Sequence, residues 1–114
     1  MSDSIDQHST EAPAPPRYRA ALVARLRTHA DEIREQGVVS LAIFGSRARG
    51  DERPDSDLDV LVDYDPERPF TLYDLVRVER LLERITGLDV HVSTRDGFHP
   101  RQLRRVLEHA VSVL

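Results

Sequence analysis

Residues 38–64 read VVSLAIFGSRARGDERPDSDLDVLVDY, and this stretch decides the fold. Its first seven residues, 38–44, form an almost unbroken apolar run with β-branched members, which is typical of a strand covered on both faces. Gly45 ends the run, and Ser46 to Gly50 is predicted to form a turn with one short helical turn. From Asp57 to Tyr64 polar and apolar residues alternate, which predicts a second strand with one apolar face.

Apolar residues at helical spacing predict a helix on each side of this stretch. Residues 17–36 carry such a stripe, and Gly37 is placed to act as the glycine that follows a helix. Thr71 and Asp74 resemble a capping box at the start of a second helix, whose stripe ends near Gly87.

The C-terminal part is predicted to add a strand and a helix. Residues 88–93 alternate between apolar and polar, which puts Asp89 and His91 on the polar face of a third strand. Pro100 is placed to open a last helix, which runs into an apolar tail at 111–114 that adds a strand or closes an interface. The order of elements predicts an α/β (α+β) fold, with a small mixed sheet flanked by helices.

Length and composition limit the function. The 114 residues suit one domain at 17–114, preceded by a Ser-, Asp-, Pro- and Ala-rich tail at 1–16 that we expect to be disordered. The chain has no cysteine and no apolar run long enough for a signal peptide or a membrane span, so we expect a cytoplasmic protein. A net charge of −4 argues against direct nucleic-acid binding.

Two short motifs in the central stretch point to nucleotide chemistry. Gly45-Ser46 leaves a buried strand and offers backbone N–H groups and a hydroxyl to phosphate oxygens. After ten intervening residues, 47–56, Asp57 and Asp59 lie on one side of a strand, where two carboxylates repel each other unless a cation intervenes. With Asp89 they form a set of hard oxygen ligands suited to Mg²⁺ and a triphosphate, and two ions about 3.5–4 Å apart can assist an in-line displacement.

These residues resemble a known family. The segments GSRARG (45–50) and SDLDV (56–60), with Asp89 in LDV downstream, are similar to the minimal nucleotidyltransferases of the polymerase-beta superfamily, in particular the MntA antitoxins. The resemblance covers about Val38 to the C-terminus. It implies a polymerase-beta-like nucleotidyltransferase palm that transfers AMP from ATP, with Mg²⁺, to a tyrosine of a partner HEPN-domain ribonuclease toxin of the HepT type. The modified toxin would be silenced within a hetero-oligomer.

The resemblance also implies a role for each motif residue. Asp57 and Asp59 would bind the metal ions, and Asp89 would complete the metal site and help to activate the attacking hydroxyl. Gly45 and Ser46 would hold the β- and γ-phosphates.

Several residues keep a second interpretation. Arg47 and Arg49 contact phosphate or the partner, or are simply solvated. Ser46 can instead cap the short helix after it, and Asp89 can be an ordinary solvent-facing acid. His91 either tunes Asp89 or is a structural histidine.

Two other functions compete with protein adenylylation. In one, the domain is a binding antitoxin that occludes the toxin by contact alone, with an idle nucleotide site. In the other, it is a nucleotidyltransferase that acts alone on an antibiotic or a nucleic acid, although such enzymes usually add a domain to hold the acceptor.

Overall fold

The computed structural model describes residues 18–114, so the predicted tail at 1–16 lies outside the described residues. Its centre is a four-stranded sheet with the order β3-β2-β1-β4. Strand β1 (Val38–Phe44) is antiparallel to both β2 (Leu58–Tyr64) and β4 (Val111–Ser112), whereas β2 is parallel to β3 (Val90–Ser93). The predicted mixed sheet is confirmed, and the apolar tail does add a strand.

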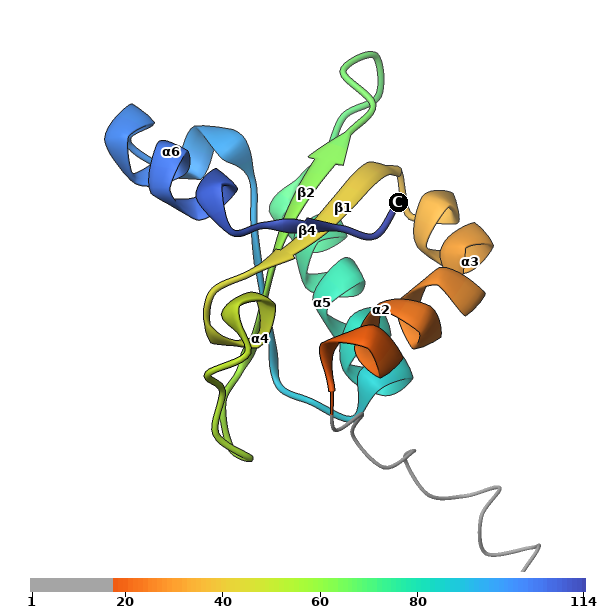
Figure 1. Ribbon diagram of the computed structural model, residues 1–114. Coiled ribbons are helices and arrows are strands. Elements are labelled where there is room, and N and C mark those ends of the chain that lie inside the picture. Colours follow the sequence, from red (N-terminus) through yellow and green to blue (C-terminus); the bar gives the residue numbers. More distant parts are fainter. Residues whose placement is uncertain (1–17) are drawn as a thin grey trace, which may run out of the picture.

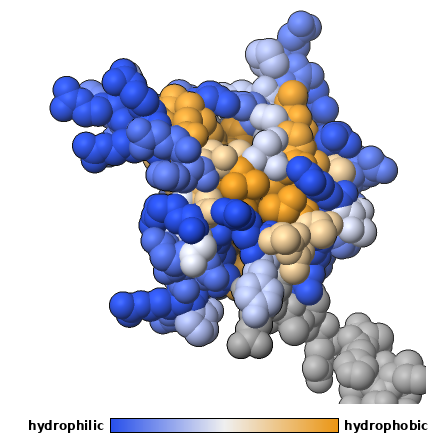
Figure 2. All heavy atoms as spheres, in the orientation of Figure 1, coloured by the Kyte–Doolittle hydropathy of each residue, from blue (hydrophilic) through white to orange (hydrophobic). Residues whose placement is uncertain are grey.

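Helices lie on both sides of this sheet, as Figure 1 shows. In the same orientation, hydrophobic residues are visible near the middle of the molecule, where β4 lies, and hydrophilic residues surround them (Figure 2). Helices α2 (Arg19–Thr28), α3 (Ala30–Glu35) and α5 (Leu72–Thr86) gather on one side. The short α4 (Ser46–Arg49) follows β1, and α6 (Pro100–Glu108) stands apart from the other helices. A single 3₁₀ turn (Arg95–Gly97) links β3 to α6.

The single helix predicted over 17–36 is wrong, because the chain bends at His29. The His29 N–H donates to the Leu26 carbonyl three residues back, so the regular helical pattern is interrupted between α2 and α3. Leu26 and Ile33 are both fully buried on either side of the bend. Both short helices therefore contribute to the core despite the bend.

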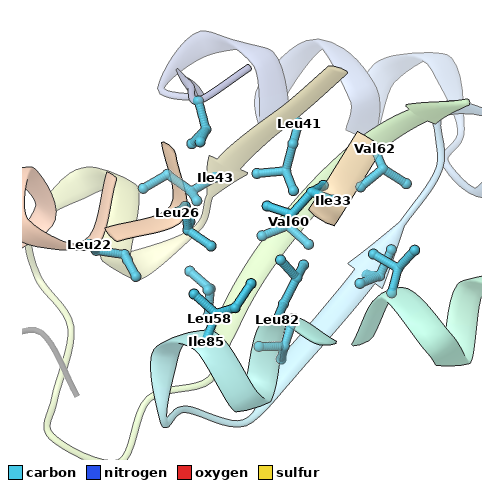
Figure 3. Packing of buried hydrophobic residues seen from close by; sticks show 14 of the residues in the cluster. Leu22, Leu26, Ile33, Leu41, Ile43, Leu58, Val60, Val62, Leu82 and Ile85 are labelled. Carbon is cyan, nitrogen blue, oxygen red and sulfur yellow. The ribbon is translucent and has the colours of Figure 1, made fainter. Parts of the chain in front are cut away.

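The hydrophobic core fills the space between one face of the sheet and the three helices (Figure 3). Alternate residues of β2 point into it, namely Leu58, Val60 and Val62, all fully buried. They pack with residues from β1 and from the helices, including Leu22, Leu26, Ile33, Leu41, Ile43, Leu82 and Ile85. Because β2 has a period of two, its other side chains, Asp59 among them, face the opposite side of the sheet.

That opposite face is only partly covered. Leu61 is buried there, outside the main core, and the ring of Phe98 packs edge-on against Phe44 with 5.9 Å between centroids. None of the residues of α6, all of them within the described range, is buried, and Leu107 is 42% exposed. The prediction that β1 is covered on both faces is wrong at Val39, which is 56% exposed.

The free edge of β3 is bonded to side chains of α5. The Val90 N–H donates to Glu83 Oε2 at 3.2 Å, and the Val92 N–H donates to Glu79 Oε2 at 3.1 Å. The predicted capping box of Thr71 and Asp74 starts helix α5, and Gly87 follows its last residue as the C-cap. These contacts fix β3 against the helix that precedes it. Over residues 18–114, no helix combines the length and the apolar composition needed to cross a bilayer.

Candidate active site

The first part of the candidate site is the turn that ends β1. Gly45 has φ 72° and ψ −153°, a backbone conformation that is essentially restricted to glycine. A Cβ atom at this position would lie 2.6 Å from Oδ2 of Asp59, which is closer than a Cβ can approach another heavy atom. The turn therefore lets the main chain lie directly against a carboxylate.

Ser46 is the first residue of α4, and Gly45 holds the N-cap position. The N–H groups of Ala48 and Arg49 both donate to the Gly45 carbonyl, each at 3.1 Å. The interpretation of Ser46 as the capping residue is wrong, because Gly45 holds the N-cap position and no side chain makes a capping hydrogen bond there. The Ser46 hydroxyl thus stands beside the glycine turn without a capping role.

The second part of the site is the start of β2. Asp57 immediately precedes the strand and is exposed, and Asp59 is its second residue and half-buried. Leu58 and Val60 point into the core, so both aspartates lie on the opposite face, as the alternation predicts. Asp59 pairs with Phe44 across the sheet, which explains why the Gly45 turn lies beside its carboxylate.

Burial raises the pKa of Asp59 above its ordinary value. His91 lowers this pKa, the negative charge of Asp57 raises it again, and Arg49 lowers it. Burial and the like charge of Asp57 thus both oppose ionisation of Asp59. A cation placed between the two aspartates would relieve both effects, which is the electrostatic environment expected of a metal ligand.

Asp89 lies at the same end of the sheet, immediately before β3. Its carbonyl accepts a hydrogen bond from the Leu58 N–H at 2.8 Å, and β2 and β3 are in register from Leu58 and Val90 onward. Asp89 therefore stands beside Asp57 along the parallel pair, with an exposed side chain. Among the side chains of 18–114, however, no group of three His, Cys, Asp or Glu is arranged to hold a metal ion.

The carboxylates of this site fit magnesium only if other ligands, such as phosphate oxygens, complete its coordination. Asp57 and Asp59 supply hard carboxylate oxygens, but three protein ligands are not gathered around one point. Magnesium is usually held by one or two carboxylates, water and substrate phosphates, not by a full protein cage. The residues present therefore fit a magnesium ion that arrives with a nucleotide.

The two arginines of α4 have different surroundings. Arg49 is exposed, and its Nε donates to Asp51 Oδ2 at 3.2 Å. Arg47 is only 6% exposed, and its guanidinium donates to backbone carbonyls of the loop before β2. Of the two, only Arg49 presents its charge to solvent beside Asp59.

His91 belongs to this region in a way that its sequence position does not reveal. In the parallel register it pairs with Asp59, and its Nδ1 lies 3.9 Å from Asp59 Oδ1. The sequence pattern placed it on the face of Asp89 but did not give the register between the two strands. Only this register shows that His91 lies beside Asp59, and the sequence carries no local signal for it.

Sequence comparison groups this chain with nucleotidyltransferases. The family described as the nucleotidyltransferase domain matches residues 26–113. Protein adenylyltransferase MntA of Thermococcus cleftensis is 36% identical over 89 residues, which cover 77% of this chain and 88% of that protein. A candidate protein adenylyltransferase of Methanocaldococcus jannaschii, MJ0435, is 40% identical over 80 residues, which cover 70% of this chain and 84% of that protein.

Solved structures give the same grouping. A candidate minimal nucleotidyltransferase superposes with a TM-score of 0.70 at 36% identity, covering 82% of this chain and 94% of that one. A Shewanella oneidensis complex of a tri-AMPylated HEPN toxin with an MNT antitoxin matches with a TM-score of 0.58 at 12% identity, over 81% of this chain and 71% of that one. At that identity the second likeness shows the shared fold alone.

Proposed function

Because the chain belongs to the family of nucleotidyltransferase domains, we propose that it is a protein adenylyltransferase that acts as an antitoxin. It transfers AMP from ATP, with Mg²⁺, to a tyrosine of a HEPN ribonuclease toxin and thereby silences that toxin. The observation that carries this proposal is the close approach of the Gly45 turn to the Asp59 carboxylate, since these are the candidate phosphate-binding turn and a candidate metal ligand. The similarity to the Thermococcus cleftensis adenylyltransferase supports the choice of a protein acceptor.

The triphosphate is held at the turn between β1 and α4. Gly45 and Ser46 contact the β- and γ-phosphates, because a main chain without a side chain at position 45 can approach a ligand closely, as it approaches the Asp59 carboxylate. Arg49 is the arginine of this segment that can reach a phosphate, because it is exposed and close enough to Asp59 to lower its pKa. Its planar, permanently charged guanidinium suits phosphate oxygens.

Asp57, Asp59 and Asp89 are the residues that would hold magnesium when it arrives with the nucleotide. When bound, magnesium neutralises phosphate charge and stabilises the leaving pyrophosphate. Asp59 is held against the Gly45 turn, whereas Asp57 and Asp89 are more exposed. Asp59 is therefore the ligand whose position is best fixed before the nucleotide binds.

The transfer is a single displacement at the α-phosphorus of ATP. The oxygen of the acceptor tyrosine attacks, a new phosphorus–oxygen bond forms, and the bond to the oxygen that bridges the α- and β-phosphorus breaks. Pyrophosphate leaves with that oxygen. The hydroxyl proton passes to a carboxylate, and Asp89 is our candidate because its exposed side chain at the start of β3 can be reached by an incoming protein.

The acceptor surface has to come largely from the partner. The residues from 18 to 114 form one sheet with its covering helices, and the face that carries Asp59 is only partly covered. A macromolecular acceptor that docks on this open face would exclude water from the reacting atoms. The enzyme and its toxin would then act as a hetero-oligomer.

Antitoxin action by occlusion alone is the second candidate function. One observation favours it: within 18–114 the acidic side chains do not form a three-ligand metal group. In this case the protein would cover the toxin without modifying it, and Asp57 and Asp59 would be idle.

The intact mass of the toxin distinguishes the two functions. The protein encoded beside this one, as the candidate toxin, is incubated with this protein, ATP and Mg²⁺, and Asp57→Asn serves as the control. A mass gain of one or more AMP units that disappears with Asp57→Asn, followed by mapping to a tyrosine, supports adenylylation. A stable complex with a neutralised toxin and no mass gain supports occlusion.

A further inference from the structure

Arg47 is the one strongly buried charged side chain among the buried residues of 18–114. Its relative exposure is 6%, whereas arginine is ordinarily an exposed residue. Removing a charge from water is costly unless hydrogen bonds replace those of the solvent. The partners of its guanidinium therefore reveal why it is buried.

All the partners found for this guanidinium are carbonyl groups of the loop that leads to β2. The Nε and Nη2 groups both donate to the Ser56 carbonyl, at 3.1 and 2.8 Å. Nη2 is also 3.5 Å from the carbonyls of Arg53 and Pro54. Within 18–114 no carboxylate forms an ion pair with Arg47, so the loop carbonyls carry the compensation for its burial.

The loop itself is a small closed turn. The Ser56 N–H donates to the Arg53 carbonyl at 3.0 Å, and the Arg53 N–H donates to Ser56 Oγ at 2.8 Å. Arg47, a residue of α4, donates hydrogen bonds to the carbonyls of this turn and so holds the turn against α4. Because Arg47 follows Ser46 and the Ser56 carbonyl belongs to the peptide that enters Asp57, one side chain links the two halves of the motif.

We infer that Arg47 is a positioning residue that holds Asp57 at a fixed distance from the Gly45-Ser46 turn before any nucleotide binds. This inference rests on the proposed function. Arg47 acts through the Ser56 carbonyl: the bonds fix the peptide before Asp57 and hence the place at which its side chain leaves the main chain. The Nε and Nη2 groups of Arg47 are directed at the loop carbonyls and are therefore engaged before a phosphate arrives.

Two substitutions separate positioning from phosphate binding. Arg47→Lys keeps the charge but lacks the planar fork that bridges several carbonyls, and Arg47→Gln removes the charge. Arg53→Gln is the matched control, because Arg53 lies in the same loop and is exposed, and only its main chain takes part in the bonds described. For each variant, ATP binding is measured by calorimetry in EDTA and then at increasing Mg²⁺.

Positioning predicts that both Arg47 variants need at least tenfold more Mg²⁺ for half-maximal binding, while ATP binding in EDTA changes less than twofold. In the transfer reaction, kcat should fall more than the KM for ATP rises. Arg53→Gln should match the wild type in each measurement. A loss of ATP binding in EDTA that Arg47→Lys restores would instead assign Arg47 to phosphate and overturn the inference.

A measurement on the wild-type protein tests the inference even if the Arg47 variants do not fold. Positioning predicts that the Arg47 Nε–H gives a solvent-protected NMR signal in the nucleotide-free protein, whose exchange is unchanged by ATP in EDTA. Rapid exchange that slows only with nucleotide would overturn it. If the wild type binds no ATP at all, the proposed function fails, and this signal still decides whether the arginine holds the loop.

Discussion

Replacing Gly45 by alanine tests the contact on which the candidate site depends. The φ and ψ angles of Gly45 lie in a region that costs a non-glycine residue about 1–3 kcal/mol. The new Cβ would also lie 2.6 Å from Asp59 Oδ2, so the carboxylate or the turn has to move. A loss of about 2 kcal/mol in the free energy of unfolding would lower Tm by roughly 8–16 °C for a domain of this size.

Thermal unfolding with and without ATP and Mg²⁺ is the assay, because a ligand that binds the folded state raises Tm. We expect Gly45→Ala to lower Tm and to abolish most of the rise caused by the nucleotide. Gly50→Ala is the matched control: Gly50 also has a positive φ, 85°, but an added Cβ meets no atom within 4 Å. This control should lose about 1 kcal/mol and keep its response to the nucleotide.

A second comparison isolates the contact with Asp59. In an Asp59→Ala background the backbone cost of Gly45→Ala remains, but the clash with the carboxylate is gone. Gly45→Ala should therefore cost less in that background than in the wild type. Equal costs in the two backgrounds, or an unchanged nucleotide response in Gly45→Ala, would refute the reasoning.

Three further predictions concern single side chains. Burial raises the pKa of Asp59, so its negative charge lowers the stability of the folded protein at neutral pH. Without nucleotide, Asp59→Asn should therefore have a higher Tm than the wild type, and its Tm should no longer rise with ATP and Mg²⁺. Arg95→Ala should lower the free energy of unfolding at pH 7 by about 0.2–1 kcal/mol, because its hydrogen bond lowers the pKa of Asp63. That difference should be full above the ordinary aspartate pKa of about 3.9 and vanish as pH falls through the lower folded-state value, as acid titration of urea unfolding would show. Thr71→Ala should cost about 1 kcal/mol through loss of the cap on α5, whereas Thr71→Ser should not, in the same unfolding assay.

The sequence was informative where local patterns decide structure. The apolar run of β1, the alternation of β2 and the capping box at Thr71 each predicted an element that the structure contains. The placement of Asp57 and Asp59 on one face of the sheet follows from the alternation alone, since every second side chain of a strand points to the same face. The family resemblance rests on these same residues, and the match over 26–113 confirms it.

Three features of the structure were not predictable from the sequence, because local patterns of residue types do not determine them. The apolar spacing of residues 17–36 continues across His29, so it does not reveal the bend that the backbone bond from His29 to Leu26 marks. Val39 belongs to an apolar run, yet it is exposed because the other face of the sheet is incompletely covered. Arg47 looked like a solvent-facing or phosphate-binding side chain, because its carbonyl partners are invisible in a list of residue types.

The glutamates of α5 that bind the edge of β3 affect how this protein can associate with others. An edge strand with free N–H groups can recruit a strand from another molecule, which leads to aggregation. Here Glu79 and Glu83 accept the hydrogen bonds of Val92 and Val90 that an added strand would need. The β3 edge of the sheet is therefore closed to a strand from another molecule, and polymers cannot grow there by β-strand addition.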